Sequence, residues 1–115
     1  MNLKIERLNH AFVREISYIL QNEIKDEMIH FVTITDCEIT NDLSYAKVYY
    51  TVLDDTKKKE TEEALKRASS FIRGKLSQRV EIRHTPELKF VFDNSIEYGK
   101  KIENIIETIH EKESE

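Results

Sequence analysis

Positively charged side chains cluster in one stretch of this 115-residue chain. Between Ala64 and His84 there are six cations and one anion, a local net charge of +5, although the whole chain carries −4. The six cations are Lys66, Arg67, Arg73, Lys75, Arg79 and Arg83. A cationic surface binds phosphate by releasing counterions, whatever the global charge of the protein. The same cations could instead pair with acidic neighbours on a solvated helix face, and charge alone does not decide between these two interpretations.

Two serines, Ser69 and Ser70, lie at the centre of this cationic stretch. Serine weakens a helix because its hydroxyl competes for backbone hydrogen bonds. The helical period itself, with an apolar stripe over residues 65–76, does not require a break at the serines. On the same period Arg79 falls within the apolar arc. Either the helix therefore ends near Gln78, or the Arg79 side chain extends outward to water.

The residue types that support catalysis or metal binding are scattered along the chain. The many carboxylates lie on solvated helix faces, and no pair of them stands in an apolar context as a general acid and base would. The four histidines lack metal-ligand spacing, and no Gly-rich phosphate loop is present. Cys37 is the one cysteine, which excludes an internal disulfide and fits a reducing compartment. We expect no enzymatic activity, no cofactor and no metal site.

The N-terminal half must supply elements that position the cationic stretch. Apolar residues over 3–24 recur at helical spacing and predict an amphipathic helix. Residues 31–39 predict a strand, and a change in the parity of its apolar positions predicts a bulge near Asp36. The turn-forming residues 40–44 and a second alternating run over 45–53 complete an antiparallel hairpin.

The apolar pattern of the C-terminal half predicts two helices with a strand between them. Residues 63–80 predict the cationic helix, and Pro86 stops it before a third strand over 87–93. Isoleucines recur at helical spacing over 96–109, which predicts a last helix. No signal peptide and no stretch of about 20 apolar residues is visible, so we expect a cytoplasmic protein without a membrane span. We expect a monomer, because the sequence shows no long apolar heptad pattern.

Three blocks stand out along the chain: ITNDLSYAKVYYTVL at 39–53, ALKRASSFIRGKL at 64–76 and HTPELKFVFDNSIEYG at 84–99. In that order and spacing, and with RLNHAFVREISYILQNEIKD at 7–26, they resemble the bacterial ribosome-binding factor A family. The resemblance covers roughly residues 5–106 of this chain. It is more specific than any short motif.

The resemblance implies an α+β, KH-like (type II) single domain with the order α-β-β-α-(kink)-α-β. A C-terminal helix would pack near the three-stranded sheet, the domain would cover residues 1–110, and residues 111–115 would form a polar tail. KH domains clamp single-stranded nucleic acid with a Gly-x-x-Gly loop, and Gly74 and Gly99 do not form one. In the family an Ala-x-Gly kink replaces that loop. The matching residues here are Ala68, Ser69 and Ser70.

The resemblance also implies a function. Family members bind the free small (30S) ribosomal subunit, assist late maturation and 5′-end processing of 16S rRNA, and matter most in the cold. Ribosomal proteins and an assembly GTPase would be further partners. The expected RNA-binding residues are the cations and the serine pair: Lys66, Arg67, Ser69, Ser70, Arg73, Lys75, Arg79 and Arg83.

Two alternatives stay open. The outward side chains Tyr45, Lys47 and Tyr49 could stack on bases, although covering the sheet is the interpretation we favour for them. The protein could also be an adaptor that docks ribosomal proteins or a GTPase through its acidic remainder, without touching RNA. Salt dependence separates these functions, because phosphate contacts weaken steeply as salt rises.

Overall fold

A computed structural model describes residues 3–94 of the chain. Its elements are α1 (Leu3–Asn22), α2 (Glu27–His30), β1 (Val32–Ile39), β2 (Tyr45–Val52), η1 (Asp55–Lys57), α3 (Lys58–Arg79) and β3 (Glu87–Phe92). The expected helix over 96–109 and the polar tail 111–115 lie outside the described residues. The expected α+β class with a three-stranded sheet is confirmed.

The sheet joins the two halves of the chain. Its strand order is β1-β2-β3, with β1 antiparallel and β3 parallel to β2. The predicted bulge is confirmed, because the register of β1 shifts between Ile34 and Asp36. One extra residue reverses the alternation of side chains. Val32, Ile34, Cys37 and Ile39 are therefore all buried although their sequence parity differs.

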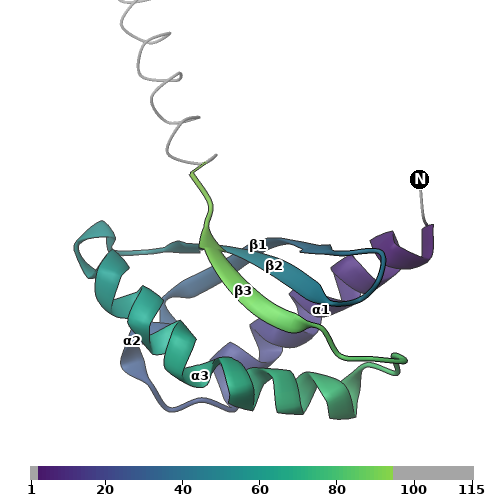
Figure 1. Ribbon diagram of the computed structural model, residues 1–115. Coiled ribbons are helices and arrows are strands. Elements are labelled where there is room, and N and C mark those ends of the chain that lie inside the picture. The colour runs from purple at the N-terminus through teal and green to yellow at the C-terminus, as the bar shows by residue number, and fades with distance from the viewer. Residues whose placement is uncertain (1–2, 95–115) are drawn as a thin grey trace, which may run out of the picture.

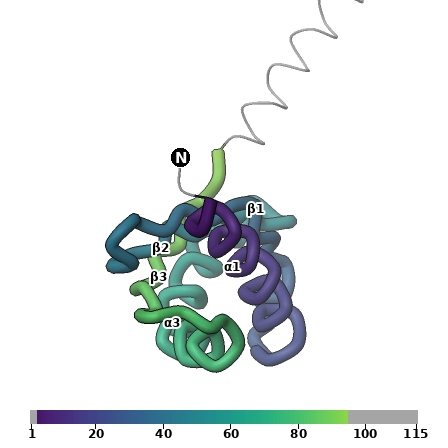
Figure 2. The backbone as a smooth tube through the Cα atoms, turned by 90° about the vertical axis from the view of Figure 1, so that its right-hand side faces the viewer, coloured from purple at the N-terminus to yellow at the C-terminus, as the bar shows by residue number. Residues whose placement is uncertain are grey.

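Two long helices cover one face of this sheet. Figures 1 and 2 show α1 and α3 side by side beneath the strands. Helix α1 buries Phe12, Ile16, Ile19 and Leu20, which confirms the predicted amphipathic stripe. These side chains join buried residues of α3 and of the inner sheet face in one core. The outer face of the sheet carries mainly polar side chains.

Two short helical turns connect the long elements. The helix α2 was not predicted, because its four residues are too few to show a period. It begins where the Asp26 carboxylate accepts a hydrogen bond from the Met28 amide at 3.0 Å. The 3₁₀ turn η1 begins in the same way, because the Asp54 carboxylate accepts a hydrogen bond from the Thr56 amide at 3.0 Å.

The kink expected at Ala68, Ser69 and Ser70 falls within a single helix, where the expected order had two. Helix α3 runs without interruption from Lys58 to Arg79. A left-handed residue that ended the helix at Ser70 would cost about 1–2 kcal/mol, because serine has a Cβ atom. The Ser69 hydroxyl donates to the carbonyl of Lys66 at 2.9 Å, so it is satisfied inside the helix. Such bonds often bend a helix, and Figure 1 shows the axis of α3 changing direction near its middle.

Cys37 provides a test of the core that depends on pH. The side chain is 1% exposed, and burial, followed by the charges of Asp36 and Glu38, raises the pKa of its thiol from 9.0 to about 12. The folded state therefore holds the thiol proton more tightly than the unfolded state. The stability that this adds is complete below pH 9.0 and falls as the pH rises toward 12. We expect the native protein to lose stability over this pH range relative to Cys37→Ala, as measured by urea unfolding. Parallel pH profiles for the two proteins would contradict this expectation.

Candidate nucleic-acid interface

An open groove runs between α3, β3 and the turn that precedes β2. Its volume is about 390 Å³. Helix α3 supplies one wall, and the start of β3 with the hairpin turn supplies the other. The lining residues are Ser44, Tyr45, Ser69, Ser70, Arg73, His84, Glu87 and Leu88. The groove therefore contains hydroxyl, cationic, imidazole, aromatic and carboxylate groups from segments far apart in sequence.

A second hollow of about 510 Å³ continues along the C-terminal half of α3. It shares Ser70, Arg73 and His84 with the groove, so the two form one polar surface. The other lining residues are Gly74, Ser77, Ile82, Arg83 and Thr85. We call the two hollows together the α3 groove. Its helical wall is formed largely by small residues, because Ser70, Gly74 and Ser77 recur on one face of α3.

Arg73 holds the two walls of the α3 groove together. Its Nη2 donates to the carbonyl of Thr85 at 2.7 Å, and its Nε lies 3.1 Å and 3.2 Å from the carbonyls of Thr85 and Pro86. At the other wall the amide of Glu87 donates to the carbonyl of Ser44 at 3.0 Å. Arg73 therefore lines the groove and also anchors the segment that begins β3.

Arg79 lies away from the α3 groove. Helix α3 ends at Arg79, one residue after Gln78, which confirms the predicted end of the helix. The Arg79 guanidinium pairs with Glu23 and lies 3.8 Å from Glu15, both on the side of α1. It also lies 4.7 Å from the ring centroid of Tyr18. The side chain is 32% exposed, so it connects the two helices instead of extending into water.

The other predicted RNA-binding cations differ in the ion pairs and ring contacts that they make within the protein. Lys66 lies 3.5 Å from Glu62 and Arg67 lies 3.9 Å from Asp26, in exposed pairs that contribute little to stability. Lys66 is one turn before Ser70 and so shares its face of α3. Lys75 lies 5.6 Å from the ring centroid of Phe71. Arg83 is exposed and makes no ion pair with any residue in the described part of the chain.

Sequence reasoning did not find the second wall of the α3 groove. The turn and the loop are brought together by the parallel pairing of Tyr45 with Glu87, and sequence periodicity does not specify that register. His84 stood out only as a histidine in a basic stretch. Tyr45 lines the groove beneath Lys89, whose Nζ is 4.3 Å from its ring centroid. Tyr49 instead donates to the Glu38 carboxylate at 3.2 Å on the outer sheet face.

Metal sites and membrane spans are absent from the part of the chain that the structure describes. No group of three or more His, Cys, Asp or Glu residues within 3–94 could hold a metal ion. No helix of that region is long and apolar enough to cross a membrane. The fold and the groove thus define a small α+β protein whose polar, partly cationic cleft lies beside one long helix.

Comparison with known proteins identifies the family within this class of small α+β proteins. The family model described as ribosome-binding factor A matches residues 4–106. The chain belongs to the ribosome-binding factor A family. It is 46% identical over 112 residues to the ribosome-binding factor A of Staphylococcus carnosus (strain TM300), covering 96% of this chain and 97% of that protein.

Solved structures support the fold. The crystal structure of ribosome-binding factor A from Thermus thermophilus matches with a TM-score of 0.70 at 23% identity, covering 76% of this chain and 93% of the other. Coordinates of the Thermus thermophilus factor, fitted into a cryo-EM map of its complex with the 30S subunit, match with a TM-score of 0.63 at 22% identity and the same coverage.

The position of Arg79 leads to a stability prediction. Replacing it with alanine removes the cation that pairs with Oε1 of Glu23, while the other oxygen, Oε2, is already buried with no hydrogen-bond partner within the described residues. Leaving a buried acceptor without its partner costs about 1–3 kcal/mol. We expect Arg79→Ala to lower the free energy of unfolding by about that amount in urea titrations. Arg83→Ala, which removes an equal charge from an exposed site, should change it by less than about 0.5 kcal/mol. Equal effects would contradict a structural role for Arg79.

Proposed function

We propose that this protein binds the free small ribosomal subunit and assists late maturation of 16S rRNA, including processing of its 5′ end. Two findings support the proposal: membership of the ribosome-binding factor A family, and the fitting of a Thermus thermophilus relative into a map of a 30S complex. The observation on this chain that carries it is the α3 groove. That surface is partly cationic although the protein as a whole is acidic.

The groove offers contacts that suit an RNA backbone. Lys66 and Arg83 are exposed at its edge and would pair with phosphates. The hydroxyls of Ser69 and Ser70 would accept from or donate to sugar oxygens, and Ser69 acts chiefly as acceptor because it already donates within α3. The exposed ring of Tyr45 would stack on a base. Contacts of this kind position a protein without reading sequence, so recognition would follow the shape of the rRNA.

Binding alone is sufficient for the proposed activity. A protein that binds one rRNA arrangement better than its competitors shifts the population toward that arrangement, and this needs no ATP and no cofactor. Misfolded rRNA helices resolve slowly at low temperature, so the factor would matter most for growth in the cold. The site of action would be the cytoplasm, where subunits mature. Ribosomal proteins or an assembly GTPase would release the factor.

An adaptor that docks a basic protein is the alternative function. Outside residues 64–84 the chain carries a net charge of −9, the difference between −4 overall and +5 in that stretch. Such a surface could bind a ribosomal protein or a GTPase without RNA contact. The two functions predict different effects of the same substitutions, because only phosphate contact ties affinity for the subunit to the cations of the α3 groove.

Binding to isolated small subunits at several salt concentrations tests the proposal. We expect steep salt dependence for the native protein. In the double variant Lys66→Gln, Arg83→Gln the slope of log affinity against log salt should fall by about 2, roughly 1 for each cation that no longer meets a phosphate. The matched control is Lys25→Gln, Lys59→Gln, which removes the same charge at exposed positions outside the groove. Its slope should stay close to that of the native protein.

Two outcomes of this experiment would contradict the proposal. Equal slopes for both double variants would remove the α3 groove as the contact surface, and salt-independent binding would favour the adaptor. The maturation step is checked in the same samples by chemical probing of 16S rRNA. Its reactivity should change when the native protein binds, and unchanged reactivity would contradict the proposed shift in rRNA structure.

Gly74 allows a test that leaves every charge in place. A Cβ atom at Gly74 would meet nothing within 4 Å, so packing does not require glycine there. Within a helix, Gly74→Ala should stabilise the protein by about 0.5–1 kcal/mol. Gly74→Gln should stabilise it by a similar or slightly smaller amount, because glutamine is also a good helix former. The longer side chain would fill the α3 groove, and we expect subunit affinity to fall about tenfold, which corresponds to about 1.4 kcal/mol. Full affinity in a well-folded Gly74→Gln protein would place the contact elsewhere.

A further inference from the structure

A second, apolar groove lies at the end of the molecule where β2 meets η1. Its volume is about 290 Å³. The two most conspicuous side chains are Leu53, 81% exposed, and Phe31, 57% exposed. The Leu53 amide donates to the carbonyl of Phe31 at 3.2 Å, so the backbone holds the two residues together. The full lining is Met28, Phe31, Val52, Leu53, Asp54, Lys57 and Thr61. We call it the Leu53 groove.

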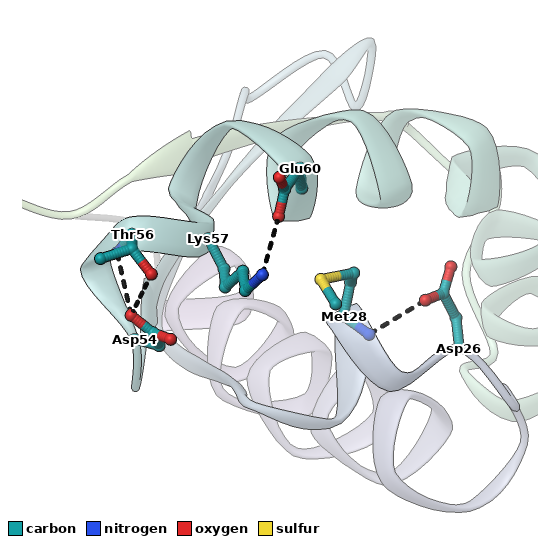
Figure 3. A network of polar contacts seen from close by, with 6 residues as sticks. All are labelled: Asp26, Met28, Asp54, Thr56, Lys57 and Glu60. Atoms are coloured by element: carbon teal, nitrogen blue, oxygen red, sulfur yellow. Dashed lines mark hydrogen bonds and ion pairs between the residues drawn. The ribbon is translucent and has the colours of Figure 1, made fainter.

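The walls of the Leu53 groove are held in place by local hydrogen bonds. Figure 3 shows Asp26 capping the turn that carries Met28, and Asp54 accepting from both the amide and the hydroxyl of Thr56. Lys57 lies 3.8 Å from Glu60 across the first turn of α3. Pre-formed apolar clefts of this kind are typical of binding sites. Exposed apolar side chains that lie together, such as Leu53 and Phe31, mark a surface where another apolar group can bind and exclude water.

We propose that the C-terminal segment of this chain, residues 95–115, docks in the Leu53 groove. The first argument is where the described chain ends. Phe92 pairs with Tyr50, and the Asp93 amide donates to the carbonyl of Tyr50 at 2.7 Å. The Nζ of Lys58 lies 3.7 Å from the ring centroid of Phe92. The chain therefore leaves β3 beside the β2–η1 connection, which forms one wall of the groove.

The second argument is the apolar pattern of the segment. At 100° per residue, five of its six large apolar side chains fall within an arc of about 100°, the width that a core-facing helix presents, and Ile96 falls outside it. The five are Tyr98, Ile102, Ile105, Ile106 and Ile109. As a helix, residues 96–109 would be about 21 Å long. An apolar stripe of that kind needs a covering surface, and the Leu53 groove offers an apolar one close to the point where the chain leaves β3.

The third argument is charge. Lys57 lines the Leu53 groove together with Asp54, and Lys58 and Lys59 follow Lys57 in the sequence. The segment 95–115 carries six glutamates and three lysines, a net charge of −3. Glu103 and Glu107 are four residues apart and would flank one side of the isoleucine stripe. An acidic, amphipathic helix would therefore place its apolar stripe in the groove and a glutamate near Lys57.

A spin label in the full-length chain tests this docking. We would attach a nitroxide to Asn104→Cys, which lies opposite the isoleucine stripe, in a Cys37→Ala background so that only one thiol reacts. The methyl signals of Met28 and Leu53 should broaden strongly. The methyl signals of Leu43, near the opposite end of β2, should not. The matched variant adds Ile105→Asp and Ile106→Asp, which lie outside the described fold, and it should restore sharp signals at Met28 and Leu53.

Each other outcome overturns the proposal. Sharp signals throughout would show that nothing from the segment reaches the groove. Broadening that persists in the aspartate variant would show that the isoleucine stripe does not make the contact. A mixture of spin-labelled chains and isotope-labelled chains without nitroxide distinguishes the source. Broadening as strong in that mixture would identify a second copy, rather than the same chain, as the occupant.

Discussion

The parallel pairing of β3 with β2 is the constraint on which the rest of this structure depends. Parallel neighbours cannot be joined by a tight turn, so the chain must cross the sheet between them. Helix α3 makes that crossing and contributes much of the core. The pairing also determines what lies at each end of β3. Its first residues lie beside the hairpin turn and close the α3 groove, and its last residues lie beside η1 and the Leu53 groove.

The cations of this protein divide between folding and binding. Arg79 connects α3 to α1, and Arg73 holds the segment that begins β3. Lys66 makes one exposed ion pair, with Glu62, and Arg83 makes none within the described residues. Arg83 lines the α3 groove, and Lys66 lies one helical turn before its lining residue Ser70. Counting charges along the sequence therefore overstates the surface that is free to meet phosphate. An arginine whose guanidinium is bound by carbonyls or carboxylates has less to offer a ligand.

The elements were predictable wherever local patterns decided them. The parity change near Asp36 located the bulge, and apolar spacing located α1, α3 and the strands. Very short elements and contacts between segments far apart in the sequence were not predictable. Helix α2 depends on one cap at Asp26, and the second wall of the α3 groove depends on a register that no local pattern specifies. Serine keeps the helical conformation at position 70, so α3 is one continuous helix with a bend near its middle, where the expected order had two helices.

An unbroken α3 has a mechanical consequence. The same helix contributes Thr61 to the Leu53 groove and Ser69, Ser70 and Arg73 to the α3 groove. A straight helix of 22 residues is about 33 Å long, and α3 bends near its middle without a break between Lys58 and Arg79. A ligand that tilts α3 at one groove therefore moves the wall of the other. Both grooves take a wall from the same helix, so displacing that helix at either groove also displaces its buried residues in the core.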